Sequence, residues 1–201
     1  NNRIYGLTKG QYSPTSEVGK ITKSTPMGSL DYPFNPPQLA LGASGTFIAR
    51  TIDREQKHMG PILEEAHKHK GTSFVEIYQN CNIFNDGAFS SLTDKETKLD
   101  TVLWLENKSP MIFGVEKNKG IRLDGNKPTV VEIGDKWSSD DILVHDESDY
   151  VIASLLSNMT YNDGFPDPIG VLYSIEETTY EDMMMNQINE ASKKKDKVTI
   201  Q

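Results

Sequence analysis

Short apolar runs and one helical stripe dominate the pattern of the first half of the chain. Apolar and β-branched residues gather at 46–50 and 73–78, and each run is short enough for a buried strand. Between them, apolar residues recur at the i, i+3, i+4, i+7 spacing of one helix face, at Met59, Ile62, Leu63 and Ala66. A strand, a helix and a strand in this order predict a right-handed βαβ unit, so we expect an α/β fold with a parallel sheet.

Capping and turn residues set the expected boundaries of these elements. Asp53, with Gln56 three residues later, resembles a capping box and is expected to start the helix. Gly60-Pro61 is expected to restart or kink the helix, because an interior proline removes a backbone hydrogen bond, and Gly71 is expected to end it. A further strand stub is expected at Ile4-Tyr5.

The second half has the pattern of a hairpin followed by a helix and a strand. Strands are expected at 111–116, 120–124 and 129–133, and a tight turn joins the first two. Asp146 is expected to cap a helix over 147–159, and a strand at 169–175 and a helix over 180–191 follow. The change of pattern predicts an α/β part over residues 1–92 and a smaller C-terminal α+β extension of hairpin and helices over residues 93–201.

Composition narrows the class of protein. The chain has 201 residues, of which 36% are hydrophobic, and this is enough for one domain with a sizeable core. The formal charge of −8 argues against nucleic acid and against an anionic membrane surface as partners. No apolar run approaches the roughly 20 residues that span a bilayer. The single thiol, Cys81, cannot form an internal disulfide, which favours a reducing cytoplasm as the location.

One long segment without periodicity, from Tyr5 to Pro37, lies between expected core elements. Connections of this length inside a compact domain are usually functional or disordered. Its lysines, glycines and hydroxyl side chains suit an anionic ligand such as a diphosphate, and a mobile surface loop is the alternative. Ligands of open α/β sheets bind outside the carboxyl ends of the strands. Parallel strands would place this segment and Cys81, which follows the strand at 73–78, at the same edge of the sheet.

Three motifs resemble the β subunits of 2-oxoacid:ferredoxin oxidoreductases. The segment 1–16, NNRIYGLTKGQYSPTS, resembles the second half of their thiamine-diphosphate motif. The segment 76–86, EIYQNCNIFND, resembles their later cysteine motif, and 144–147 with 168–171 resembles their C-terminal region. The resemblance implies a thiamine-diphosphate-binding-type fold, a three-layer α/β/α arrangement with a parallel sheet. Residues 1–92 would then be the C-terminal half of the cofactor-binding domain.

The resemblance also implies residue roles. A magnesium ion on the diphosphate would be held by the Asn2 side chain and the Ile4 main-chain carbonyl, together with an aspartate of an upstream Gly-Asp-Gly. The cofactor would contact the residues of this motif, which are Asn2, Ile4, Tyr5, Gly6, Leu7 and Thr8. The catalytic end of the pocket would be lined by Leu7, Thr8 and Lys9. Pyruvate-specific relatives tend to carry Asn where this chain has Leu7, so Leu7 favours 2-oxoglutarate.

Cys81 maps onto the fourth ligand of a 4Fe–4S cluster near the thiamine. The other three ligands of the family lie near the N-terminus, in and after a Cys-Pro-x-Cys motif, and such a cluster needs four thiolates. This chain has one cysteine and no Gly-Asp-Gly. Both motifs would precede Asn1, so we expect a truncated chain that is inactive by itself. Without the resemblance, a lone cysteine is more often an inert buried residue.

The activity that the resemblance implies is oxidative decarboxylation of a 2-oxoacid to acyl-CoA, with electrons passed to ferredoxin. The cofactors would be thiamine diphosphate, magnesium and the 4Fe–4S cluster, which carry the chemistry while the protein orients it. The partners would be an α subunit of the same oxidoreductase, ferredoxin, the 2-oxoacid and coenzyme A. A non-catalytic α/β docking or assembly module is the alternative, and the residues encoded before Asn1 would discriminate between the two.

Overall fold

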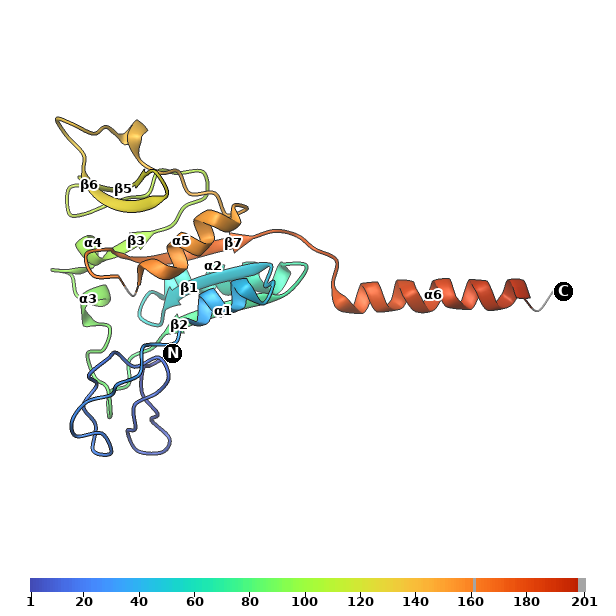
Figure 1. The fold of residues 1–201 in the computed structure, drawn as a ribbon, viewed down its shortest axis with the longest axis horizontal. Helices are drawn as coiled ribbons and strands as arrows, with labels where there is room; N and C mark the ends of the chain where they lie inside the picture. Colours follow the sequence, from blue (N-terminus) through green and yellow to red (C-terminus); the bar gives the residue numbers. More distant parts are fainter. Residues whose placement is uncertain (161, 199–201) are drawn as a thin grey trace.

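The computed structural model describes residues 1–160 and 162–198, and its main sheet has four strands in the order β2-β1-β7-β3 (Figure 1). The strands are β1 (Phe47–Ile52), β2 (Ser73–Tyr78), β3 (Val102–Trp104) and β7 (Asp167–Ser174). β1 and β2 are parallel, as the βαβ pattern predicts, whereas β7 is antiparallel to β1 and parallel to β3. The sheet is therefore mixed and not purely parallel. A single helix connects β1 to β2 and makes that pair parallel, whereas the longer connections to β3 and β7 leave their directions free.

Helices cover both faces of this sheet. The helices are α1 (Pro36–Gly42), α2 (Gln56–Lys68) and α5 (Tyr150–Met159). Successive residues of β1 point to opposite faces, so Phe47 packs with Ile62 of α2, while Ile48 packs in one cluster with Leu41 of α1 and Leu156 of α5. The predicted α/β class with three α/β/α layers is confirmed (Figure 1).

A second, three-stranded antiparallel sheet lies beside the main one, with the order β4-β5-β6 (Figure 1). It consists of β4 (Ile112–Phe113), β5 (Lys119–Asp124) and β6 (Lys127–Glu132), which confirms the predicted hairpin and third strand. Met111 and Ile121 share a buried cluster with Ile48 of β1. Both β3 and β7 follow residue 92 in the sequence and lie in the main sheet, and the proposed boundary at residue 92 stays a prediction.

Three short helical turns complete the connections between these elements. They are α3 (Ser90–Thr93), α4 (Lys98–Thr101) and the 3-10 turn η1 (Ser139–Asp141). The sequence pattern did not predict them, because each is too short to carry a helical period.

Two predicted helix caps are wrong. α2 begins after Glu55, and Asp53 instead accepts a hydrogen bond from the backbone of Asn80 at 3.2 Å. α5 is capped by Asp149, which accepts from the first backbone N–H groups of the helix at 2.8 and 3.1 Å. Asp146, three residues earlier, closes a turn onto Ser148. Several aspartates near each helix start can cap it, and the tertiary path of the chain selects one.

Two predicted breaks around α2 also differ from the structure. The helix continues through Pro61 from Gln56 to Lys68, so the predicted restart at that proline is wrong. The helix ends at Lys68 with His69 as its C-cap, and Gly71 lies in the connection to β2.

The expected strand stub at Ile4-Tyr5 is also wrong, and the strand-like contact lies earlier. The backbone nitrogen of Asn1 donates to the Ile77 carbonyl at 2.7 Å, and the Gln79 nitrogen donates to the Asn1 carbonyl at 3.0 Å. This is parallel-type pairing at the carboxyl end of β2. Arg3 then takes a left-handed φ of 51°, which ends the extended path, and Tyr5 pairs with Gln11 in a local turn.

The last helix, α6 (Tyr180–Val198), projects away from the rest of the molecule (Figure 1). It begins at the predicted residue and runs seven residues beyond the predicted end, because the polar stretch after Ala191 continues as helix. Across the described residues, no helix has the length and apolar character needed to cross a membrane.

Candidate functional site

Two chain segments that are far apart in sequence meet at the carboxyl end of β2. These are the segment 1–11 and the turn 79–86 that follows β2. The buried side chain of Asn85 donates to the carbonyls of Asn2 at 2.9 Å and Arg3 at 3.3 Å. On its other side, Asn85 accepts from Lys20 Nζ at 2.5 Å, so one amide ties the start of the chain, the long loop and the β2 turn together.

A hollow of about 470 Å³ opens beside this junction. Asn2, Ile4 and Tyr5 line it together with Thr15 and Glu76. Among the described residues, neither the Asn2 side chain nor the Ile4 carbonyl has a hydrogen-bond partner. Oxygen atoms without protein partners at a hollow are the kind of ligand that Mg²⁺ takes. The two residues that the resemblance assigns to magnesium therefore fit that role chemically.

Asn1 fixes the backbone that carries these oxygens. Its side-chain nitrogen donates to Glu76 Oε1 at 2.7 Å, and its side-chain oxygen accepts from Thr15 Oγ1 at 2.7 Å and from the Arg3 nitrogen at 3.1 Å. The buried Ser16 hydroxyl donates to the Arg3 carbonyl at 2.6 Å. The segment 1–4 is thus held from both the sheet and the long loop before any ligand binds.

Glu76 in turn belongs to a buried ion pair. Arg50 Nε donates to Glu76 Oε2 at 2.8 Å, and the side chains are 0% and 2% exposed. Burial alone would lower the pKa of Arg50, but the surrounding Tyr78, Glu76 and Asp167 raise it, so the guanidinium stays charged. Burial also raises the pKa of the Asp167 carboxyl, which is the main cause there. This cluster is a fixed charge arrangement directly behind the hollow.

Leu7, Thr8 and Lys9 lie elsewhere, at the exposed tip of the turn 5–11. Leu7 is 99% exposed, and the Thr8 hydroxyl donates to Gln11 within the turn at 2.5 Å. Lys9 adopts a left-handed φ of 74°. None of the three lines the 470 Å³ hollow. Their expected catalytic role remains a prediction, and they would meet a ligand only from the outer side of this turn.

Cys81 lies against the same turn. Its sulfur is 3.7 Å from the position that a Cβ atom on Gly6 would take. The backbone N–H groups of Phe84, Ile83 and Asn85 point at the sulfur and lower the pKa of the thiol. This favours the thiolate, the form that binds metals. Cys81 is half-buried and unpaired, so the sulfur is available to a ligand.

The described residues do not form a complete metal site by themselves. In residues 1–160 and 162–198, no group of three or more His, Cys, Asp or Glu side chains could hold a metal ion. The resemblance assigns one thiolate of a cluster to Cys81 and two oxygens of a magnesium site to Asn2 and Ile4, and these assignments remain predictions.

Sequence reasoning did not identify Asn85, Glu76 or Arg50 as parts of the site, and it named Thr15 only as one of many hydroxyl residues in the long loop. One signal was present, because Arg50 and Glu76 are single charged residues within two apolar strands. Those strands pair in parallel with Arg50 opposite Glu76. Charged residues are almost never fully buried unless they are paired. The roles of Asn85 and Thr15 depend on loop geometry that no local pattern predicts.

Comparison with known proteins identifies the family. Residues 1–77 match the family described as thiamine pyrophosphate enzyme, C-terminal TPP binding domain. The chain is 44% identical over 190 residues, 94% of its length, to the 2-oxoglutarate oxidoreductase subunit KorB of Mycobacterium tuberculosis. Over most of its length the chain is therefore similar to the β subunits of the 2-oxoacid:ferredoxin oxidoreductases. This confirms the resemblance drawn from its motifs.

The β-subunit relatives are longer than this chain. It spans 50% of the M. tuberculosis protein. A 2-oxoacid:ferredoxin oxidoreductase subunit beta of Saccharolobus solfataricus is 42% identical over 101 residues, which are 50% of this chain and 33% of that protein. The chain thus spans about half or less of the curated relatives that it matches.

A solved structure shows the same fold. It is a 2-oxoglutarate:ferredoxin oxidoreductase from Magnetococcus marinus with 2-oxoglutarate, coenzyme A and succinyl-CoA bound. Its TM-score to this chain is 0.66 at 24% identity, over 95% of this chain and 50% of that one. The matched thiamine pyrophosphate domain, residues 1–77, contains Asn2, Ile4, Arg50 and Glu76 but ends before Cys81.

Proposed function

We propose that this chain supplies the diphosphate and magnesium end of a thiamine diphosphate site in a β subunit that oxidatively decarboxylates a 2-oxoacid to its acyl-CoA. The observation that carries the proposal is the pair of unpartnered oxygen ligands, Asn2 and the Ile4 carbonyl, at the 470 Å³ hollow. When bound, thiamine diphosphate supplies the electron sink for decarboxylation.

The residues of the chain have distinct roles in this proposal. Asn2 and the Ile4 carbonyl hold magnesium, and Asn1, Glu76 and Asn85 keep their backbone in position. Tyr5 and Gly6 follow on the same turn and contact the cofactor. Leu7, Thr8 and Lys9 face the substrate from the outer side of that turn, where a further part of the enzyme closes over them. Orientation by a rigid backbone is the main contribution that such residues make.

In this proposal Cys81 would be one thiolate ligand of a 4Fe–4S cluster, which would supply one-electron transfer toward ferredoxin. The backbone N–H groups directed at its sulfur support this role, since hydrogen bonds to sulfur are one means by which proteins adjust cluster potentials. The remaining three thiolates come from outside this chain, which has a single cysteine.

The substrate and partners are proposed from the residue pattern and the relatives together. Leu7 and the names of the M. tuberculosis and M. marinus proteins favour 2-oxoglutarate as the 2-oxoacid, with coenzyme A as acyl acceptor. The assembly includes an α subunit of the same oxidoreductase. A cytoplasmic location fits the need of a free Cys81 thiol for a reducing compartment.

The decisive experiment uses the full-length subunit that contains this chain, expressed with its α subunit. Asn2→Ala should weaken magnesium-dependent thiamine diphosphate binding at least about tenfold, which is about 1.4 kcal/mol. Calorimetric titration measures the binding, and reduction of ferredoxin with 2-oxoglutarate measures the activity. Asn189→Ala, on the exposed face of α6, is the matched control and should change neither. Unchanged binding in Asn2→Ala would refute the site and favour a non-catalytic docking or assembly module.

A further inference from the structure

α6 is a helix without visible support from the rest of the fold. It has 19 residues and is therefore about 28 Å long, and it leaves the body at the connection after β7 (Figure 1). Most helical stability in proteins comes from packing of an apolar face rather than from helix propensity alone. A helix of this kind is expected to find a partner.

One face of α6 is suited to such packing. Apolar residues recur at spacings of four, four and three, and we call them the apolar stripe: Tyr180, Met184, Ile188 and Ala191. All four are exposed, including Ile188 at 49%. The opposite face carries polar residues such as Asp182, Asn186 and Asn189. The spacing matches the contact seam of helices that pair side by side.

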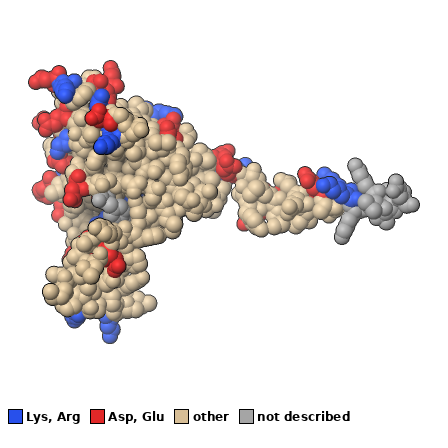
Figure 2. Space-filling view, viewed as in Figure 1, with Lys and Arg blue, Asp and Glu red and all other residues tan. Residues whose placement is uncertain are grey.

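Most charges of α6 lie toward its two ends, and Glu190 lies beside the lysines of the far end. Four acids form what we call the acidic junction, at and just before the start of the helix: Glu176, Glu177, Glu181 and Asp182. Lys193 and Lys194 form the basic end. In Figure 2 acidic residues gather where the arm meets the body, and basic residues lie toward its far end with an acidic residue beside them. Glu181 and Lys193 are about 18 Å apart along the axis, so the two groups cannot pair within one helix.

We propose that α6 pairs antiparallel with α6 of a second copy of this chain. Antiparallel pairing places the basic end of each helix beside the acidic junction of the other and brings the two apolar stripes together. Parallel pairing would instead place acids beside acids and lysines beside lysines, which is unfavourable. The arrangement has two-fold symmetry, so both charge contacts form twice.

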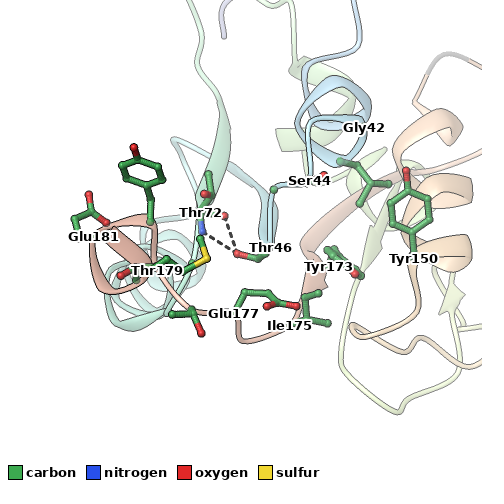
Figure 3. Close-up of a pocket in the computed structure, with 16 residues that line it drawn as sticks. Gly42, Ser44, Thr46, Thr72, Tyr150, Tyr173, Ile175, Glu177, Thr179 and Glu181 are labelled. Carbon is green, nitrogen blue, oxygen red and sulfur yellow. Dashed lines mark hydrogen bonds between the residues drawn. The ribbon is translucent and has the colours of Figure 1, made fainter. Parts of the chain in front are cut away.

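The base of the arm offers room for the far end of the partner helix. A hollow of about 740 Å³ lies there, lined by Tyr150, Tyr173, Glu177, Thr179 and Glu181 among others (Figure 3). Met183 of α6 borders the same hollow. A partner helix of equal length, laid antiparallel, brings its Lys193 and Lys194 to the level of this acidic rim. The inference is independent of the proposed cofactor site, which lies at the other end of β2.

Sedimentation of the chain over a range of concentrations tests the pairing. We expect a reversible monomer–dimer equilibrium that weakens as salt is added. Ile188→Glu, on the apolar stripe, should weaken it at least about tenfold. Asn189→Glu makes the same substitution on the polar face and should leave it within about twofold. A chain that stays monomeric up to about 1 mM overturns the proposal, as does an equal effect of the two substitutions.

Charge reversal tests the direction of pairing. Glu177→Lys with Glu181→Lys should weaken self-association, and so should Lys193→Glu with Lys194→Glu. The variant with all four substitutions should recover wild-type association, because both ends of an antiparallel pair are then reversed together. Failure of the fourfold variant to recover would overturn antiparallel pairing. Circular dichroism of each variant separates this outcome from loss of the helix itself.

Discussion

Arg50 Nε donates to Glu76 Oε2 at 2.8 Å across the parallel pairing of β1 and β2, with both side chains removed from solvent. The other carboxylate oxygen of Glu76 accepts from the Asn1 side chain at 2.7 Å. One carboxylate therefore joins the centre of the sheet to the segment that carries the proposed magnesium ligands. Loss of this ion pair should therefore both destabilise the fold and displace the segment that carries the proposed magnesium ligands.

Glu76→Gln should destabilise the chain by about 3 to 5 kcal/mol, because it leaves the Arg50 guanidinium buried without its counter-charge. Denaturant unfolding followed by circular dichroism measures the change. Glu64→Gln breaks an exposed ion pair with Lys68 and should cost less than about 0.5 kcal/mol. Similar losses of unfolding free energy in the two variants would mean that the buried ion pair stabilises the fold no more than the exposed one.

Gly10→Ala should destabilise the turn that lies against Cys81 by about 2 kcal/mol or more. Gly10 has a φ of 96°, and an added Cβ would lie 2.8 Å from the Phe84 ring. Gly19→Ala separates the strain of the positive φ from the steric contact. Gly19 has a φ of 80°, but nothing lies within 4 Å of its Cβ position. In thermal unfolding, the melting temperature of Gly10→Ala should be lower than that of Gly19→Ala. The reverse order would contradict the packing of Phe84 on this turn.

Glu147 should make stability depend on pH near neutrality. Burial, with help from the Glu65 and Asp146 carboxylates, raises the pKa of Glu147 to about 7. The folded state therefore binds a proton that the unfolded state releases near pH 4.5. The corresponding stability is complete below that value, is lost as the pH rises through about 7, and stays lost above it.

The matching variant is Glu147→Gln. At pH 8 it should be more stable than the wild type by about 1 kcal/mol, a figure reduced because the side chain is half-exposed. The difference should disappear at pH 4. Urea unfolding at a series of pH values measures it, and Glu65→Gln should move the wild-type transition to lower pH. A constant difference between pH 4 and pH 8 would exclude titration of Glu147 as the cause.

Cys81 should react with alkylating reagents at a lower pH than an ordinary cysteine. The backbone N–H groups of Phe84, Ile83 and Asn85 stabilise the thiolate and lower the pKa of the thiol. The rate of iodoacetamide modification plotted against pH should have its midpoint below about 8.5, the usual cysteine value. Chain unfolded in urea provides the reference. A midpoint that does not rise on unfolding would contradict the hydrogen bonding.

The elements that sequence predicted well are those defined by local periodicity. The two strands of the βαβ unit and the hairpin after residue 110 follow from short runs and a tight turn. The direction of β7 could not be predicted, because its neighbours β1 and β3 lie more than fifty residues away along the chain. The sequence could not show that Asp149, and not Asp146, caps α5 for a similar reason. The choice depends on the tertiary path of the chain before the helix.

The candidate site shows the same limit. The contact between the first residues and the Cys81 turn was predicted, because both were expected at the edge of the sheet where parallel strands have their carboxyl ends. The clamp by Asn85 and the role of the Arg50–Glu76 pair were not, since each joins residues separated by 26 to 83 positions. Such contacts become visible only when the tertiary path is known.

The place of β7 between β1 and β3 has a consequence for synthesis on the ribosome. β1 leaves the ribosome well before β7, its neighbour on one side, because β2, β3 and the second sheet lie between them in the sequence. Until residue 174 has left the exit tunnel, the apolar faces of β1 and β3 have no shared strand to pack with. The main sheet is therefore expected to close only after β7 has been synthesised, and nascent chains that stall before that point should be clients for chaperones.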